Sequence, residues 1–462
     1  MKVMSPMDSL FLIGESREHP LHVGGLQVFT PPQGAGPEFV RDTYEAMLAC
    51  EDISPTFRKR PATAFGGFIN VAWTFDDDID LEYHVRRSAL PAPGRVRELL
   101  ELTSRLHGTL LDRHRPLWES HLIESPNDGR FAIYTKVHHA LVDGVSALKL
   151  MQRSLSTDPG ESEIRVPWAL PPDPRQRAEA RPSGVQRLTG TTPSVAHKGP
   201  STLALARAAM QVRELTPPFR APRTMLNVPI GGARRCAAQS WSLKRITAVK
   251  DAAGTTVNDV VLAMCAGALR AYLTDLSALP DMPLVAMVPV NVRTEHGSGG
   301  GNAVSTVLCD LATHLNDPAK RLEVIHTSMQ ENKKALSQLP RAEATAVGIL
   351  TFTTMWLSGL RGFRAAPPPF NICISNVPGP QQTLYCNGAR LDGNYPLSVA
   401  MNGQALNITV ATCGDDLDFG LVGCRRSVPH LQRLLDHLEA ALKDLEQAVG
   451  VGEPRIATRS RA

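Results

Sequence analysis

The sequence has few of the features that mark membrane-spanning or secreted proteins. It contains no run of roughly 18 or more uninterrupted apolar residues, the length that a membrane-spanning helix needs. The nearest approach, residues 344–360, is uncharged but contains several Thr, Ser and Gly residues, so we expect a buried or interfacial helix there. The segment from Met1 to Phe11 holds one lysine and no long apolar core, and it therefore does not resemble a secretory signal.

Paired cysteines and several common catalytic motifs are also missing. The eight cysteines are scattered, with no C-x-x-C pair, which argues against a disulfide framework or a zinc ribbon and fits a reducing cytoplasm. The sequence has no G-x-S-x-G elbow, no P-loop and no H-E-x-x-H helix. The chemistry that those motifs supply is therefore not predicted.

The residues that are present describe a globular protein, because 43% are apolar and 20% are charged. At 462 residues the chain is too long for one ordinary core, so we expect two domains. The net charge of +4 is unevenly spread, because the segment from Arg165 to Arg235 contains twelve Lys and Arg residues but only three acidic residues. Proline is also frequent there. We therefore assign residues 156–235 to a crossover linker between domains.

Apolar periodicity predicts that strands and helices alternate in both halves of the chain. In the first half we expect strands at 20–30, 70–75 and 131–137, and helices at 38–50, 95–111 and after Gly144. In the second half we expect strands at 239–243, 284–292, 370–375 and 397–401, a hairpin of 406–412 with 417–423, and helices at 257–273, 318–339 and 431–445. A helix-like island at 201–215 interrupts the linker. The fold class is therefore α/β, with domains at 1–155 and 236–450 and a flexible tail at 451–462.

Two adjacent histidines, His138 and His139, follow the strand at 131–137. A strand end is a rigid platform, and an imidazole that titrates near pH ~6.5 can accept a proton at physiological pH. Adjacent residues of a strand point to opposite faces, so only one of the two should face a given pocket. A metal site would need more ligands nearby, and only Asp143 is close in sequence. A purely structural role for a strand-end histidine is the alternative.

The segment His138-His139-x-x-x-Asp143-Gly144 resembles the signature of the CoA-dependent acyltransferase superfamily, which includes chloramphenicol acetyltransferase and non-ribosomal condensation domains. The surrounding residues are most similar to the bacterial wax ester synthase/diacylglycerol acyltransferases. The similar blocks, in order along the chain, are Ser5-Pro6-Met7-Asp8-Ser9, Pro20-Leu21-His22-Val23-Gly24-Gly25, Pro116-Leu117-Trp118, Asn258-Asp259-Val260-Val261-Leu262-Ala263, Pro289-Val290-Asn291-Val292-Arg293 and Ser375-Asn376-Val377-Pro378-Gly379-Pro380. The resemblance covers nearly the whole chain except the basic linker.

The resemblance implies two chloramphenicol acetyltransferase-like domains with an active-site channel between them. It implies that His139 is the general base and that Asp143 points away from the substrate to pair with an arginine, for which Arg293 is the candidate. Asp143 can equally serve as a stabilising acid at a helix N-terminus. His138 and Gly144 complete the motif.

Several other positions that carry the resemblance have two interpretations each. Thr256-x-x-Asp259 resembles a capping box, so Asp259 has either a capping role or a functional one, and Asn258 is the better candidate for a hydrogen-bond donor to substrate. Ser375 and Asn376 could donate to a tetrahedral oxyanion, or could simply form a turn. Pro116 and Trp118 are expected to be packing residues.

The implied activity is transfer of a long-chain acyl group from acyl-CoA to diacylglycerol or to a long-chain alcohol, with no resident cofactor. Alternatives are another thioester donor or a small alcohol acceptor, or an inactive lipid-binding protein of the same fold. The chain departs from the family near its C-terminus, where Cys424 replaces a frequent acid and Pro429-His430 replaces Pro-Asp. These departures bear on subfamily and acceptor more than on the chemistry.

The basic linker has three interpretations: a solvated tether, an attraction to anionic lipid headgroups, or a contact with CoA phosphates. Nucleic-acid binding is not expected, because the segment lacks interleaved aromatic residues and any reader motif. We expect a cytoplasmic protein that contacts the inner face of the plasma membrane or lipid droplets.

Overall fold

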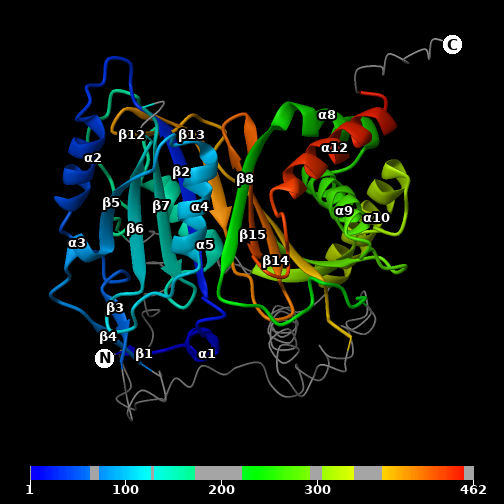
Figure 1. Cartoon of the computed structure of the whole chain (residues 1–462), viewed down its shortest axis with the longest axis horizontal. Helices are drawn as coiled ribbons and strands as arrows, with labels where there is room; N and C mark the ends of the chain where they lie inside the picture. The colour runs from blue at the N-terminus through cyan, green and yellow to red at the C-terminus, as the bar shows by residue number, and fades with distance from the viewer. Residues whose placement is uncertain are drawn as a thin grey trace, which may run out of the picture.

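The computed structural model of the chain describes residues 2–62, 72–125, 129–171, 221–291, 304–337 and 367–451. The expected helices at 344–360 and 201–215, the candidate partner Arg293 and the tail after residue 451 lie outside these ranges. Two six-stranded sheets stand side by side, and helices α4 and α5 lie near their boundary (Figure 1). The mixed α/β, two-domain fold predicted from the sequence is thereby confirmed.

The first sheet has the strand order β12-β13-β2-β7-β6-β5. Its strands from the N-terminal half are β2 (His22–Thr30), β5 (Val85–Ala89), β6 (Trp118–Glu124) and β7 (Phe131–His138), and the helices of this half are α1 (Pro6–Gly14), α2 (Phe39–Leu48), α3 (Leu81–His84), α4 (Val96–His107) and α5 (Gly144–Arg153). A small separate sheet joins β1 (Lys2–Val3), β4 (Ala72–Phe75) and β3 (Lys59–Pro61).

Strand β7 lies in the middle of the first sheet and is buried at every position. Its side chains alternate between two apolar cores, as strand geometry requires. Phe131, Ile133 and Val137 belong to a core that also holds residues of α2 and α5. Ala132 and Tyr134 belong to the core shared with α4 and the second sheet. Both faces of the strand are therefore covered, which holds its C-terminal end in place.

The second sheet has the order β10-β9-β11-β14-β15-β8. Its strands are β8 (Arg234–Ser242), β9 (Val285–Asn291), β10 (Val304–Asp310), β11 (Ile372–Val377), β14 (Leu406–Cys413) and β15 (Asp416–Cys424), and its helices are α8 (Leu243–Ala253), α9 (Val257–Asp275), α10 (Pro318–Ser337) and α12 (Arg433–Ala448). The predicted hairpin between β14 and β15 is present. Strand β10 and helix α8 were not predicted, because each presents only a short apolar pattern, such as Ile246 and Val249 in α8.

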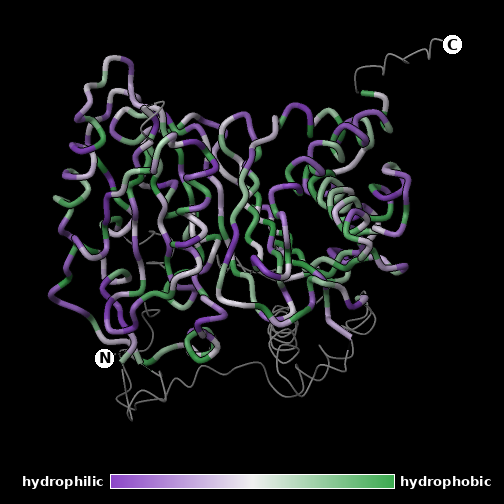
Figure 2. The backbone as a smooth tube through the Cα atoms, in the orientation of Figure 1, coloured by the Kyte–Doolittle hydropathy of each residue, from purple (hydrophilic) through white to green (hydrophobic). Residues whose placement is uncertain are grey.

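Among the described helices, α9 alone is both long enough and apolar enough to cross a membrane, judged by length and composition. However, two thirds of that segment is buried inside the protein, where α9 packs against α10 and α12. Figure 2 shows the same concentration of apolar residues along this helix and the central strands. We therefore describe α9 as the core helix of the second domain.

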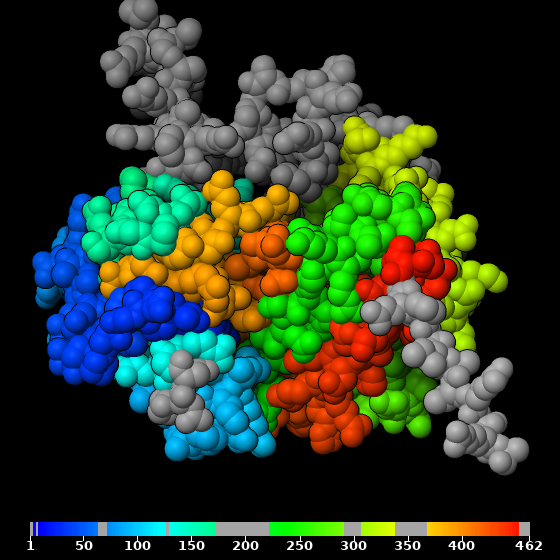
Figure 3. All heavy atoms as spheres, turned by 90° about the horizontal axis from the view of Figure 1, so that it is seen from above, coloured from blue at the N-terminus to red at the C-terminus, as the bar shows by residue number. Residues whose placement is uncertain are grey.

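Strands β12 (Tyr385–Cys386) and β13 (Ala389–Leu397) depart from the predicted division into domains. They come from the C-terminal half, yet β13 pairs with β2 of the first sheet, and Figure 3 shows the orange segment among blue and teal residues. The strand predicted at 397–401 was therefore misplaced. The strand was not predicted at its actual position because its apolar alternation is interrupted by Asp392, Gly393 and Asn394, at a bulge between Leu391 and Gly393.

The described ends of the predicted linker are packed rather than free. Trp168 is fully buried and stacks on Trp118, with ring centroids 5.0 Å apart. Leu226 belongs to the large core of the second domain. Strand β8 begins at Arg234, slightly before the predicted end of the linker. The solvated-tether interpretation therefore does not apply to the stretches around Trp168 and Leu226.

Candidate active site

The paired histidines lie where β7 leaves the sheet and α5 begins. The backbone holds them from both sides: the His138 N–H donates to the carbonyl of Leu117 at 2.9 Å, and the His139 N–H donates to the carbonyl of Leu21 at 2.9 Å. The alternation along β7 directs His138 toward the face of Tyr134 and Lys136, and His139 toward the opposite face. The backbone thus separates the two imidazoles, as the sequence predicted.

His138 is completely buried, and its imidazole contacts the protein through both nitrogens. The N–H of Ala140 donates to Nδ1 at 3.0 Å, and Nε2 lies 3.3 Å from Oε1 of Glu15. An Nδ1 that accepts a hydrogen bond leaves the proton on Nε2, facing the carboxylate. The first histidine of the motif therefore anchors the turn that follows the strand, residues 138–142, which we call the histidine turn.

Glu15 lies in the loop between α1 and β2, and its side chain is buried. Its carboxylate accepts from the backbone N–H of Leu21 at 3.1 Å and pairs with Arg113 at 3.1 Å. Burial by itself would raise the pKa of Glu15, but His138, Leu21 and Arg113 together hold that pKa below its usual value. Glu15 is therefore ionised and links the histidine turn to the N-terminal segment.

His139 is only partly buried, which separates it from His138. Its ring stacks on Phe11 with centroids 4.1 Å apart and an angle of 19° between the planes. Burial lowers the pKa of His139, and this outweighs the opposing influence of Asp143 and of the residue's own backbone carbonyl. The imidazole is therefore neutral at physiological pH, as a general base must be.

Asp143 is the N-cap of α5 and is exposed. One carboxylate oxygen accepts the N–H of Ser146 at 3.0 Å, and the other accepts its hydroxyl at 2.7 Å. The helix-capping interpretation of Asp143 is thus confirmed, while pairing with Arg293 stays a prediction, since Arg293 lies outside the described ranges. Gly144 is the first residue of the helix.

The structure brings α5 together with the segment that contains Ser375 and Asn376. Leu148 of α5 packs against Val377, at the end of β11, and against Ala411 of β14. Gly379 approaches so closely that an added Cβ would lie 2.0 Å from the carbonyl oxygen of Thr412, so only glycine fits. The histidine turn and the Ser-Asn segment are therefore neighbours across the domain boundary.

Ser375, Asn376 and Asn258 are each half-buried. Within the described ranges their side chains make no hydrogen bond with the protein, so their polar groups are free to meet a substrate. Of the two interpretations of Asp259, a helix-capping role and a functional role, the helix-capping role is confirmed. Asp259 forms a capping box with Thr256, and its Oδ2 lies 2.7 Å from Nδ1 of His326. In the described part of the chain, no hydrogen bond or ion pair joins Asp259 to the histidine turn.

Pro116 and Trp118 are packing residues, as predicted. Trp118 is fully buried, its indole N–H donates to the carbonyl of Phe57 at 2.9 Å, and its ring stacks on His84. Pro116, two residues earlier, is also buried, and its carbonyl accepts the backbone N–H of Trp118 at 2.9 Å. They fix the start of β6, the neighbour of β7.

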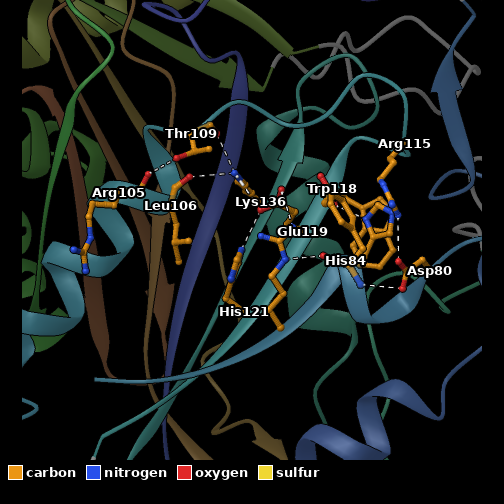
Figure 4. A network of polar contacts seen from close by, with 12 residues as sticks. Asp80, His84, Arg105, Leu106, Thr109, Arg115, Trp118, Glu119, His121 and Lys136 are labelled. Atoms are coloured by element: carbon orange, nitrogen blue, oxygen red, sulfur yellow. Dashed lines mark hydrogen bonds and ion pairs between the residues drawn. The ribbon is translucent and has the colours of Figure 1, made fainter. Parts of the chain in front are cut away.

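A buried charge network supports β7 two residues before the histidines (Figure 4). The ammonium of Lys136 donates to the carbonyls of Leu106 and Thr109 at 3.1 and 3.0 Å and lies 3.3 Å from the carboxylate of Glu119, its cross-strand neighbour on β6. Glu119 also lies 3.1 Å from Nε2 of His121. Lys136 thereby joins the end of α4 to the central strand.

The sequence did not indicate Phe11, Glu15, Arg113 or Lys136 as part of this region. Each is an isolated residue of a common type, and the partners of Glu15 come from distant parts of the chain. The predicted interdomain channel also stays a prediction.

The fold defines the class of the protein, a two-domain α/β protein with the fold of condensation domains. The starter condensation domain of rhizomide synthetase is 14% identical over 99% of this chain and 96% of that one, with a TM-score of 0.58, and shows the common fold. The wax ester synthase/diacylglycerol acyltransferase from Marinobacter aquaeolei VT8 is 43% identical, with a TM-score of 0.79 over 97% of this chain and all of that one.

Family comparisons narrow the class further. Residues 4–261 match the wax ester synthase/diacylglycerol acyltransferase catalytic domain, and residues 300–446 match the C-terminal domain of the same family. A Mycobacterium tuberculosis H37Rv protein that is provisionally assigned as a diacylglycerol O-acyltransferase is 64% identical over 97% of this chain and its own full length. The chain therefore belongs to the wax ester synthase/diacylglycerol acyltransferase family and is an acyltransferase of that family.

Proposed function

We propose that the protein transfers a long-chain acyl group from acyl-CoA to the hydroxyl of diacylglycerol, of a long-chain alcohol, or of both, with His139 as general base. The observation that carries this proposal is the contrast between the two histidines. His138 is fully buried and engaged with Glu15 and Ala140, whereas His139 is partly exposed and neutral. Relatives assigned as diacylglycerol O-acyltransferases support the choice of acceptor.

In this mechanism the buried Nδ1 of His139 keeps its proton, and Nε2 accepts the proton of the alcohol. The alcohol oxygen attacks the thioester carbonyl and forms a tetrahedral oxyanion. Collapse of that species breaks the C–S bond, and the imidazolium returns the proton to the departing thiolate of CoA. A positioned base contributes roughly 10²–10⁴-fold, and holding both substrates together contributes further.

We assign supporting roles to the other members of the site. Asp143 and Ser146 close the first turn of α5 and so hold the histidine turn. Ser375, Asn376 and Asn258 are the candidate donors to the substrate or to the oxyanion, because their polar groups have no partner within the described ranges. Arg293 is the candidate partner of Asp143.

The test is an acceptor panel with one long-chain donor. Palmitoyl-CoA is supplied with diacylglycerol, with hexadecanol or with neither, and neutral lipid and free thiol are both measured. His139→Ala should abolish ester formation without changing the melting temperature, whereas His114→Ala, which removes an exposed imidazole, should change neither. A fully active His139→Ala protein would refute the assignment of the base.

Two alternatives give different results in the same panel. A protein that uses another thioester donor or a small alcohol would leave palmitoyl-CoA intact but would consume the other donor. An inactive lipid-binding protein would release no CoA whichever alcohol is supplied. Release of CoA that depends on a long-chain acceptor therefore supports the proposal against both alternatives. A second panel with another thioester donor and a small alcohol then separates the two alternatives from each other.

We also propose that the protein works from the cytoplasmic side at a lipid surface, the plasma membrane or a lipid droplet. The excess of Lys and Arg between residues 165 and 235 supports this, because basic residues near an anionic surface contribute about 1 kcal/mol each. Flotation with anionic and with neutral vesicles tests it. Replacing Arg175, Arg177, Arg181 and Arg187 with Gln should reduce flotation with anionic vesicles; unchanged flotation would refute the role of the linker.

A further inference from the structure

A cavity of about 1030 Å³ lies at the boundary between the two domains, and its lining includes none of the residues assigned to the reaction. Its walls are the C-terminal half of α4, the loop that precedes β2, the loop that precedes β8 and the turn that follows β15. Helix α4 and strand β8 lie side by side there (Figure 1). We call this cavity the arginine groove, because it is lined by Arg17, Arg105, Arg234, Arg235, Arg425 and Arg426.

The arginine groove has far more positive than negative charge. Only Glu18 and Glu101 among its lining residues are acidic. Arg17, Arg105 and Arg425 are exposed and form no ion pair within the described ranges. Arg235 reaches Glu101 only at 4.0 Å. Because guanidinium groups stay charged at any physiological pH, these cations repel one another unless an anion lies between them.

The walls of the arginine groove are held rigidly by Arg234, which is buried. Its guanidinium donates to the carbonyls of Gly231, Glu18 and Ala400, at 2.5, 2.7 and 3.0 Å, so one side chain ties three of the surrounding segments together. The backbones also approach closely: a Cβ on Gly232 would lie 2.6 Å from the carbonyl oxygen of Arg17. The exposed arginines therefore project from a preformed concave frame.

We propose that the arginine groove binds the phosphate groups of the donor, the pyrophosphate and the 3′-phosphate of the CoA nucleotide. The proposal rests on the proposed function, since that function makes acyl-CoA the donor. Arginine forms strong, two-pronged hydrogen bonds with phosphate oxygens. The volume is that of a small-molecule site of about 300–1,000 Å³, whereas a flat lipid surface could not enter a concave groove.

The position of the arginine groove also fits a donor site. Arg17 lies two residues after Glu15, whose carboxylate contacts His138. Thr109, on the rim, accepts from Lys136, two residues before the same histidine. The groove is therefore linked to the histidine turn by the loop that holds Glu15 and Arg17 and by the hydrogen bond between Lys136 and Thr109.

The test compares two donors that differ only in the phosphates. Arg105→Ala and Arg425→Ala are assayed with palmitoyl-CoA and with palmitoyl-pantetheine, which has the same thioester but no nucleotide. We expect each variant to raise KM for palmitoyl-CoA by about 10-fold, the loss of one charge-assisted contact, and to leave kcat/KM for palmitoyl-pantetheine unchanged. Arg41→Ala on α2, an exposed arginine far from the groove, is the matched control.

Direct binding separates this proposal from the proposed function. Adenosine 3′,5′-bisphosphate is titrated calorimetrically into the wild-type protein and into the double variant Arg105→Ala/Arg425→Ala. Binding that is at least about 10-fold weaker in the double variant supports the groove even if no transferase activity is found, in which case only the proposed function fails. Equal binding to both proteins, or an equal rise of KM for both donors, overturns the groove. Loss of flotation with anionic vesicles at an unchanged KM would assign the arginines to a lipid surface instead and would also overturn it.

Discussion

Glu15 is the residue whose replacement tests how the paired histidines are held. Its buried carboxylate faces three donors, the imidazole of His138, the backbone N–H of Leu21 and the guanidinium of Arg113. Glu15→Ala leaves all three without an acceptor in a buried site. Removing one partner of a buried ion pair costs about 3–5 kcal/mol, so this variant should be strongly destabilised.

Glu15→Gln is the discriminating variant, because it keeps the shape and one acceptor oxygen but removes the charge. That oxygen can still accept the backbone N–H of Leu21, so we expect the free energy of unfolding to fall by only about 1.5–3 kcal/mol, the contribution of a hydrogen bond to a charged group. A histidine turn that shifts by about 1 Å would also lower kcat by roughly 10²-fold, while KM for the donor should change less.

The assays are urea unfolding and steady-state transfer with palmitoyl-CoA. The expected order of stability is wild type, then Gln, then Ala. Glu38→Gln removes an exposed carboxylate that pairs with Arg41 and serves as control, with no change expected in either assay. If Glu15→Gln unfolds and turns over like the wild type, then Glu15 does not support the turn.

Three further predictions concern the surrounding framework. Burial lowers the pKa of His107 to about 3 and that of His22 well below its usual value, so on acidification the unfolded chain binds protons that the folded chain does not bind. Between pH 7.0 and 5.5 each histidine should therefore lower the free energy of unfolding by about 1 kcal/mol. Urea unfolding at several pH values measures this, and a stability that does not change with pH would contradict it. Lys136→Met should destabilise by about 3 kcal/mol, partly recovered by adding Glu119→Gln; additive losses would show that the pair is not coupled. Gly379→Ala should destabilise by about 1–3 kcal/mol, measured by thermal melting, and an unaltered Tm would argue against the close backbone approach.

The histidine pair could be recognised from the sequence, whereas the residue that holds it in place could not. The motif itself is contiguous, and strand alternation places His138 and His139 on opposite faces. The sequence could therefore nominate one of them as the base. It could not show that His138 is anchored by Glu15, because no pattern connects a single acid near the N-terminus with a strand more than one hundred residues later.

The same distinction applies to the other candidates. The capping box at Thr256 and Asp259 was recognised because both partners lie within one turn of helix. The contact between Asp259 and His326 was not, since 67 residues separate them. The arginines of the groove come from four separate segments, and only two of them, Arg234 and Arg235, fall in the basic stretch that the sequence singled out.

The sequence by itself determined the family, the α/β class, most helices and strands, and the identity of the candidate base, since these depend on local patterns and contiguous motifs. Only the tertiary structure decided that β13 completes the sheet of the other domain, that Glu15 and Arg113 hold the histidine turn, and that arginines from four segments line one groove. The physical reason is that these features arise from pairing and packing between residues far apart in the chain, and a local pattern does not encode which distant residues will meet.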